Sequence, residues 1–100
     1  MNKKNILILG ANGLVGSSCT RVLSKNKSYN IIPSTRADTD LFNLDETKKL
    51  ISSSKPDVLI IAAAKVGGIY ANNTKRVEFL LENLKINTNI LESCIENNNI

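Results

Sequence analysis

Two short runs of consecutive apolar residues, at positions 6–9 and 58–63, stand out from an otherwise mixed sequence. In both runs the apolar positions are continuous and do not alternate with polar ones. This pattern is typical of parallel strands that are covered on both faces. A third, shorter strand is predicted at residues 29–33, where Ile31 and Ile32 lie between turn-forming residues. The sequence therefore predicts three strands of a parallel sheet.

Helical periodicity follows each strand. The first predicted helix ends at Asn26 and Lys27, and its inward face is predicted to consist of Val15, Cys19, Val22 and Leu23. The second begins at Asn43, which can cap it, and Glu46 completes a capping box. A long helix is expected from about residue 74 to 96, with six side chains predicted to face inward: Val77, Leu80, Leu81, Leu84, Leu91 and Ile95. Alternating strands and helices predict an α/β fold with right-handed crossovers.

A glycine-rich turn, G-x-x-G-x-x-G, joins the first strand to the first helix. Gly10 lets the chain reverse, Gly13 removes a side chain where backbone would approach a pyrophosphate, and Gly16 permits close packing of helix on strand. Because the motif lies between a strand and a helix, it indicates a dinucleotide site in a Rossmann-type doubly wound sheet, although a merely structural turn is the alternative. The residues predicted to bind the cofactor here are Gly10, Ala11, Asn12, Gly13, Leu14, Val15 and Gly16.

The end of the second strand bears on which dinucleotide is bound. NAD-binding domains usually place an acidic residue about 20 positions past the glycines, to hold the ribose 2′-hydroxyl. Here Arg36 occupies that region, and its planar guanidinium suits a 2′-phosphate, which favours NADP over NAD. The alternative is a surface arginine, with Asp38 close to the same position. Asp40, followed by Leu41, either accepts a hydrogen bond from the adenine amino group or is an ordinary aspartate of the loop.

Composition narrows the possible functions. One hundred residues allow a single domain or part of one, and the net charge of +4 is scattered along the chain with few aromatic residues, which argues against nucleic-acid binding. Histidine is absent, which removes Ser-His-Asp chemistry and most zinc sites from these residues. Cys19 and Cys94 are predicted to be core thiols, neither metal ligands nor a disulfide. No run approaches the roughly 20 apolar residues that span a bilayer, so we expect a cytoplasmic protein without a membrane partner.

A more specific signal lies at residues 62–74. This segment, A-A-A-K-V-G-G-I-Y-A-N-N-T, closely resembles the A-A-A-K-V-G-G-I-x-A-N-N-T segment of the GDP-L-fucose synthases, which are extended short-chain dehydrogenases. The similarity continues through Phe79, Asn83, Ile86 and Asn89, and the glycine turn, Arg36 and the Asp40–Leu41 pair fit the same family. The resemblance implies epimerisation of two carbons beside the ketone of a GDP-linked 4-keto-6-deoxy sugar, reduction of that ketone by NADPH, and a homodimer.

The resemblance also implies roles for individual residues. Residues 10–16 would bind the pyrophosphate, Arg36 the 2′-phosphate, and Asp40 and Leu41 the adenine. Ala62, Ala63 and Ala64 would line the cofactor at the carboxyl end of the third strand, and Val66, Gly67 and Gly68 would edge the sugar site. Small side chains and paired glycines at a strand end agree with this assignment. Many family members carry arginine at the position of Asn12, so the NADP prediction depends more heavily on Arg36.

No catalytic residue is assigned in this chain. Four positions after Tyr29 and Tyr70 stand Pro33 and Thr74, so neither tyrosine forms the Tyr-x-x-x-Lys pair of short-chain dehydrogenases. We expect residues 1–100 to be the N-terminal βαβαβα part of an NAD(P)-binding Rossmann domain, inactive without the remainder of that domain and a substrate domain. Two alternatives stay open: another nucleotide-sugar epimerase or dehydratase of the extended short-chain type, and a non-catalytic NADP-binding module.

Overall fold

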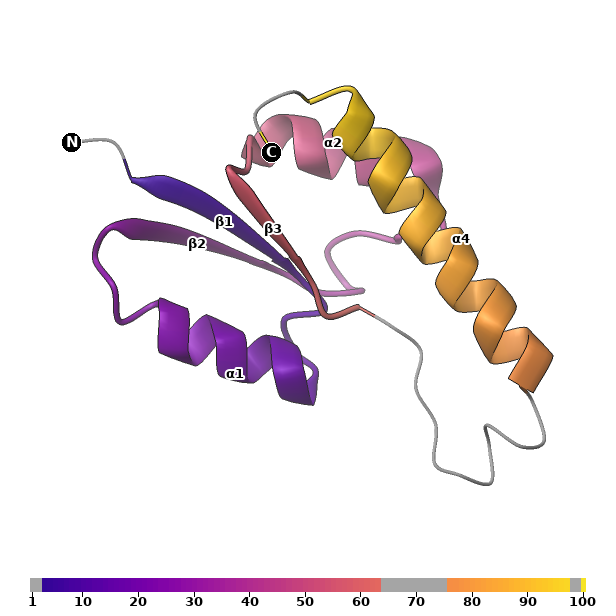
Figure 1. Cartoon of the computed structure of the whole chain (residues 1–100), viewed down its shortest axis with the longest axis horizontal. Helices are drawn as coiled ribbons and strands as arrows, with labels where there is room; N and C mark the ends of the chain where they lie inside the picture. Colours follow the sequence, from indigo (N-terminus) through magenta and orange to yellow (C-terminus); the bar gives the residue numbers. More distant parts are fainter. Residues whose placement is uncertain (1–2, 64–75, 98–99) are drawn as a thin grey trace.

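A computed structural model of the chain describes residues 3–63, 76–97 and 100. Strands and helices alternate along the chain, as the sequence predicts (Figure 1). The elements in order are β1 (Lys4–Leu9), α1 (Leu14–Leu23), β2 (Tyr29–Ser34), α2 (Leu44–Ser54), β3 (Val58–Ile61) and α4 (Arg76–Ile95).

The three strands form one parallel sheet in the order β2-β1-β3. Ile6 of β1 pairs with Ile31 of β2 on one side and with Val58 of β3 on the other. The chain therefore starts in the centre of the sheet, moves outward to β2, and crosses back to the other side of β1. This reversal of direction is the feature that creates a ligand crevice at the carboxyl ends of the strands in open α/β sheets.

Each face of the central strand packs against a different layer of helices. Leu7 and Leu9 lie in a core with Ile51 of α2 and with Ile86 and Ile90 of α4. On the other face of β1, Ile6 and Ile8 pack with Cys19 and Leu23 of α1, and α1 lies opposite α2 and α4 (Figure 1). This two-sided cover explains why the apolar run in β1 is continuous and confirms the predicted doubly wound arrangement.

Helix α2 begins and ends with well-defined caps. The Asn43 side-chain oxygen accepts a hydrogen bond from the Glu46 amide at 3.1 Å, as the capping-box pattern predicts. The reciprocal bond differs, because the Glu46 carboxylate accepts from the amide of Asp40 at 3.5 Å. The helix stops where Lys55 adopts a left-handed conformation with φ 46°. Pro56, which follows directly, cannot continue the helix.

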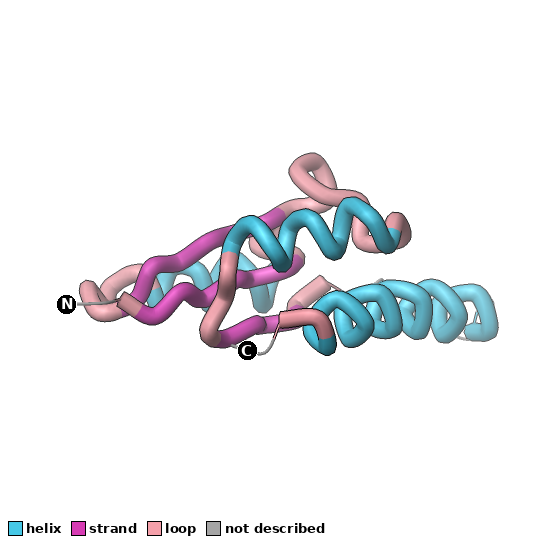
Figure 2. Tube along the Cα trace, turned by 90° about the horizontal axis from the view of Figure 1, so that it is seen from above, coloured by secondary structure: helices cyan, strands magenta, loops and turns pink. Residues whose placement is uncertain are grey.

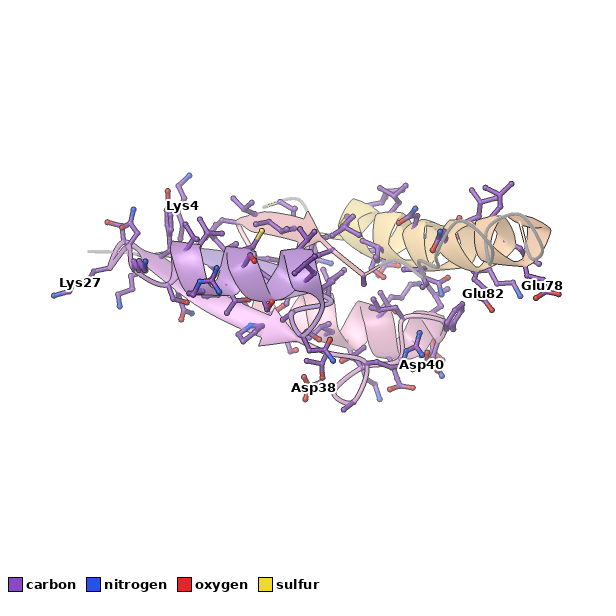
Figure 3. The ribbon with its side chains drawn as sticks, turned by 90° about the horizontal axis from the view of Figure 1, so that it is seen from below. Lys4, Lys27, Asp38, Asp40, Glu78 and Glu82 are labelled. Carbon is purple, nitrogen blue, oxygen red and sulfur yellow. The ribbon has the colours of Figure 1, made fainter. Side chains whose placement is uncertain are left out.

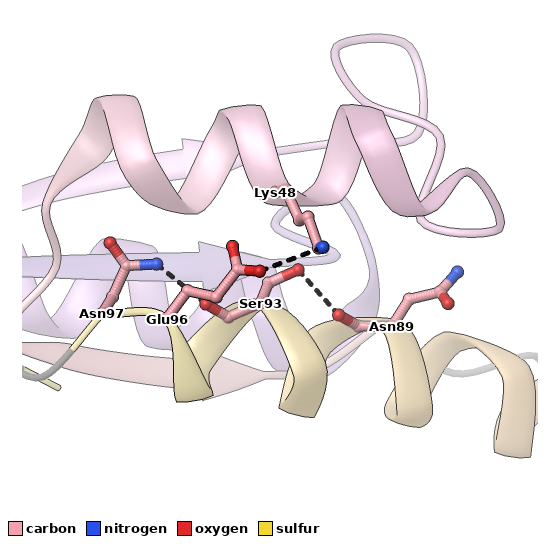
Figure 4. Close-up of polar contacts among 5 residues, drawn as sticks. All are labelled: Lys48, Asn89, Ser93, Glu96 and Asn97. Carbon is pink, nitrogen blue, oxygen red and sulfur yellow. Dashed lines mark hydrogen bonds and ion pairs between the residues drawn. The ribbon is translucent and has the colours of Figure 1, made fainter.

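Helices α2 and α4 run side by side on the same face of the sheet (Figure 2). Lys48 of α2 and Glu96, just after α4, form an ion pair of 3.1 Å at the exposed edge of this contact (Figure 4). Inside the contact Ser93 is fully buried, and its hydroxyl donates to the carbonyl of Asn89 one turn earlier at 2.7 Å. The buried hydroxyl therefore needs no partner on another element.

The predicted inward face of α4 is wrong. Its members among the described side chains are more than half exposed, namely Leu80, Leu81, Leu84, Leu91 and Ile95. The buried side chains are instead Ile86, Ile90 and Ser93. Positions 84 and 86 are two residues apart, so they point about 200° apart around the helix. Apolar residues thus line both sides of α4, and periodicity alone favoured the side with more apolar residues. Val77 was also predicted to face inward, but its side chain lies outside the described residues.

The inward face of α1 was predicted correctly only in part. Cys19 and Leu23 pack against the sheet, whereas Val15 is 63% exposed and Val22 is 57% exposed. Cys19 and Leu23 pack on the side of the helix where Gly16, by lacking a side chain, approaches Gly10 and Ala11 closely. The two valines are turned away from this side of the helix.

Candidate functional site

The chain turns sharply between β1 and α1 at Gly10, as predicted. Its φ angle is 77°, in the left-handed region that favours glycine. The N–H groups of Gly10 and Ala11 both donate to the carbonyl of Ser34 at 3.0 Å, which fastens the turn to the end of β2. A Cβ atom on Gly10 would lie 2.7 Å from the amide nitrogen of Ala63. The ends of β2 and β3 therefore enclose this turn from both sides.

The other two glycines of the turn meet different surroundings. A Cβ atom on Gly16 would collide with the carbonyl oxygen of Gly10, so only glycine lets α1 approach the turn this closely. A Cβ atom on Gly13 would meet only Gly10, at an ordinary contact distance of 3.5 Å. Gly13 is therefore not required for packing, and its missing side chain opens the space in front of the helix.

The start of α1 presents backbone N–H groups without a side-chain cap. Gly13 occupies the N-cap position and has no side chain that could accept from the first turn. The first turn also contains no acidic residue. The first N–H groups of a helix lack partners within the helix, and the helix dipole adds partial positive charge there. This end of α1 is therefore suited to an anionic group.

A cavity of about 320 Å³ opens beside this helix end, at the carboxyl ends of the three strands. Its lining comes from the glycine turn, from the segments that follow β2 and β3, and from α4. Eight of the residues predicted to contact a cofactor line it: Gly10, Asn12, Gly13, Arg36, Asp40, Leu41, Ala62 and Ala63. The fold thus brings together residues from four separate segments of the chain.

Four other predicted cofactor residues do not line the cavity. Ala11 is buried in the core beneath it, and Gly16 is buried between α1 and the turn. The side chains of Leu14 and Val15 are exposed to solvent. These residues can therefore contribute to the site only through the backbone N–H groups of the first helical turn. Ala64, Val66, Gly67 and Gly68, predicted for the cofactor and the sugar, lie outside the described residues.

Sequence reasoning missed five residues that line the cavity: Ser34, Thr35, Thr39, Phe42 and Ile86. Ser34 and Thr35 could have been found, because they end β2 at the edge where such sheets bind ligands. Ile86 was part of the family resemblance, but its apolar pattern did not indicate a place in the site, since it belongs to the weaker of the two apolar stripes of α4.

The segment after β2 forms a turn that holds Asp38. The Asp38 carboxylate accepts from the amide of Thr35 at 2.9 Å and from its hydroxyl at 3.0 Å. Arg36 lies within this turn and lines the cavity. Asp38 was the residue that complicated the choice of dinucleotide, and here its charge is engaged by its own turn. The basic side chain is therefore the ionic group that this turn contributes to the cavity.

Asp40 has a local role of its own. One of its carboxylate oxygens accepts from the amide of Phe42 at 3.0 Å, and its backbone carbonyl accepts from the amide of Asn43 at 3.0 Å. Figure 3 shows Asp38 and Asp40 together in the connection between β2 and α2. Asp40 thus stabilises its loop, as expected of an ordinary loop aspartate. Its second carboxylate oxygen could still accept a hydrogen bond from the adenine amino group.

The cysteines belong to the packing of the fold. Cys19 and Cys94 are free thiols that pack against the two cores on opposite faces of the sheet. Burial raises the pKa of the Cys94 thiol, which favours its neutral form. Within residues 3–63, 76–97 and 100, no group of three potential ligands could hold a metal ion. None of the helices formed by these residues has the length and apolar character to cross a membrane.

A parallel sheet that reverses direction at β1, with a glycine turn and an uncapped helix start at the reversal, defines a nucleotide-binding class of α/β domain. The model of the NAD dependent epimerase/dehydratase family matches residues 6–99, and the chain belongs to this family.

Three similar proteins carry names that refer to GDP-linked sugars. GDP-L-fucose synthase 1 from Arabidopsis thaliana is 42% identical over 91 residues, covering 91% of this chain and 28% of that protein. The GDP-mannoheptose C4 reductase MlghC from Campylobacter jejuni with NADP bound has a TM-score of 0.85 at 30% identity, covering 98% of this chain and 29% of that one. A GDP-L-fucose synthetase from Naegleria fowleri bound to NADP has a TM-score of 0.76 at 28% identity, covering 96% and 28%. This chain therefore spans less than a third of these relatives.

Proposed function

We propose that this chain is the N-terminal, NADP-binding part of a GDP-sugar epimerase and reductase, specifically a GDP-L-fucose synthase. The observation that carries the proposal is the single cavity in which the glycine turn, Arg36 and the end of β3 meet. The 42% identity to the Arabidopsis synthase and the NADP bound to two structural relatives support it. On this proposal residues 1–100 form part of a Rossmann domain, and catalytic residues lie elsewhere in the protein.

The pyrophosphate would lie at the start of α1. The backbone N–H groups of Leu14 and Val15 lie in the first turn of the helix, whereas the N–H of Gly13 donates to the carbonyl of Gly10; Gly13 leaves the approach open. The exposed side chains of Leu14 and Val15 need not contact the ligand for this, because the donors are in the backbone. Asn12, which lines the same part of the cavity, would supply an uncharged hydrogen-bonding side chain.

The 2′-phosphate would pair with Arg36. A guanidinium presents a planar fork of donors that matches phosphate oxygens. Asp38 would repel that phosphate if its carboxylate faced the cavity without partners. Asp38 does not line the cavity, and its two hydrogen bonds to Thr35 hold its carboxylate within its own turn, which would leave Arg36 to determine the preference for NADP over NAD.

The adenine would lie between the loop of Asp40 and Leu41 and the side chain of Ile86. Leu41 and Ile86 offer apolar surfaces for the ring, and the free carboxylate oxygen of Asp40 would accept from its amino group. When bound, NADPH would supply the hydride for reduction of a ketone. The small side chains of Ala62 and Ala63 would let the nicotinamide half pass the end of β3. Cofactor contact by Ala64, and sugar contact by Val66, Gly67 and Gly68, are proposed from the sequence resemblance.

Two partners follow from the proposal, a GDP-linked sugar and a second copy of the protein. A different GDP-sugar C4 reductase is the second candidate function, because MlghC matches this fold at a TM-score of 0.85, above the 0.76 of the fucose synthetase. Incubating the intact protein with NADPH and either GDP-4-keto-6-deoxy-mannose or a 4-keto GDP-heptose separates the two candidates. Faster oxidation of NADPH with the first sugar, and GDP-fucose as product, is the expected result.

The cofactor assignment is tested by titrating the intact protein with NADPH and with NADH. We expect NADPH to bind at least tenfold more tightly. Arg36→Ala should weaken NADPH binding by about 10- to 100-fold, the range of a charge-assisted hydrogen-bond pair, and leave NADH binding unchanged. Arg21→Ala, on the exposed side of α1, is the matched control and should change neither affinity. Equal affinities for the two cofactors in the wild-type protein would show that the 2′-phosphate assignment is wrong.

A further inference from the structure

We infer that Asn89 of α4 is a positioning residue, which holds the loop of residues 39–42 in the place where it contacts the adenine. The inference rests on the proposed function, because it assigns the adenine to that loop. It goes further by naming a side chain outside the cavity lining that determines how selectively the base is held.

The carboxamide of Asn89 donates to the backbone carbonyl of Leu41 at 2.9 Å, in a partly buried position. The two residues are 48 positions apart in the sequence. This bond therefore joins α4 to the loop that precedes α2. The Thr47 hydroxyl lies 3.5 Å from the same carbonyl but is 2.8 Å from the carbonyl of Asn43, which is its stronger acceptor. Asn89 therefore makes the principal side-chain hydrogen bond to the Leu41 carbonyl.

Other hydrogen bonds of this loop are local. The amide of Phe42 donates to Asp40, and the amide of Thr39 donates to the carbonyl of Thr35. Such bonds define the shape of the loop, but they do not fix where it lies relative to the sheet and α4. The Leu41 side chain packs against the core, and the bond from Asn89 ties the backbone carbonyl of the same residue, next to Asp40, to α4.

The position of Asn89 on α4 makes this bond relevant to the cavity. Ile86 lies one turn earlier on the same face of the helix and lines the cavity directly. One face of α4 thus provides a wall of the cavity at Ile86 and fixes the facing loop through Asn89. If the loop shifted away from α4, the distance between the Asp40 carboxylate and a base packed on Ile86 would change.

The test compares NADPH with its reduced hypoxanthine analogue, in which an oxygen replaces the adenine amino group. We expect the intact wild-type protein to bind NADPH at least tenfold more tightly than the analogue, because a carboxylate accepts from the amino group but repels the oxygen. Asn89→Asp keeps the side-chain shape but removes the donor, and should reduce this ratio to about threefold or less. Asn87→Asp makes the same change at an exposed position of α4 and should leave the ratio at its wild-type value.

This ratio separates positioning from a loss of folding, because unfolded protein lowers both affinities equally. Asn89→Ser, which is too short to reach Leu41, provides a second variant if Asn89→Asp does not fold. A ratio that stays at its wild-type value in a folded Asn89 variant overturns the inference and leaves the NADP assignment intact. A wild-type protein that binds both ligands equally also overturns it, whereas a wild-type protein with no preference for NADPH over NADH overturns the proposed function as well.

Discussion

The two walls of the cavity are held in place by different means. The glycine turn is held by its backbone: Gly10 adopts a left-handed angle, donates to the end of β2, and leaves no room for a side chain against β3. The loop of residues 39–42 takes its local shape from backbone bonds and from Asp40, but it is held against α4 and the core by side chains, through Asn89 and the packing of Leu41. A site wall built from backbone constraints is coupled to the stability of the fold, whereas a wall tied by side chains can change its ligand affinity without loss of the fold.

The largest expected effect comes from breaking the backbone wall. Gly10→Ala places a Cβ atom 2.7 Å from the backbone of Ala63 at a φ angle of 77°, which combines steric overlap with a strained conformation. We expect a loss of about 3 kcal/mol in the free energy of unfolding, measured by chemical denaturation of the intact protein.

Gly13→Ala is the matched control within the same turn. Its Cβ atom would make only an ordinary 3.5 Å contact, so we expect less than about 1 kcal/mol of destabilisation. The same methyl group would obstruct the approach to the start of α1, so NADPH binding should weaken by tenfold or more. A destabilisation of Gly13→Ala as large as that of Gly10→Ala would contradict the distinction drawn between the two glycines.

The difference between the walls also explains what the sequence could predict. The glycine turn and the Asn43 cap were predicted because each constraint acts within a few residues of the chain. The buried face of α4 was not, because Leu84 and Leu91 form a fuller apolar stripe than Ile86 and Ile90, and only the packing against α2 and the sheet selects between them.

The hydrogen bond from Asn89 to the loop could not be predicted from local sequence patterns. Its acceptor is a backbone carbonyl 48 residues away, and any residue at position 41 would offer one. An asparagine in the middle of a helix is usually a solvated residue, so the side chain by itself indicates no partner. The contact follows only once the sheet order has placed α4 beside the segment that leaves β2.

A smaller effect is expected next to the side-chain wall, at the start of α2. Asn43→Ala removes the cap that accepts from Glu46, which should cost about 1 kcal/mol in the free energy of unfolding. Asn43→Asp retains an equivalent acceptor and should unfold like the wild-type protein. Because Asn43 follows the loop directly, we expect NADPH binding to weaken by about threefold or less in Asn43→Ala, measured by titration. A loss of binding as large as that in Arg36→Ala would mean that the cap, and not Asn89, fixes the loop.

The smallest effect is expected at the ion pair between α2 and α4. Lys48 and Glu96 lie 3.1 Å apart, with the Glu96 side chain 56% exposed, so solvent and salt screen their attraction. The hydrogen bond to Glu96 and its negative charge raise the pKa of Lys48 above its usual value, so any stabilisation is fully present at neutral pH and is lost only as the pH rises through that raised pKa. Lys48→Ala should therefore leave the unfolding midpoint at pH 7 unchanged within error, at low and at high salt. A marked loss of stability would show that α4 is held against α2 by charge. The position of Asn89, and of the loop that it binds, would then depend on the ionic strength and not on the apolar contact of Ile86 and Ile90 with Ile51.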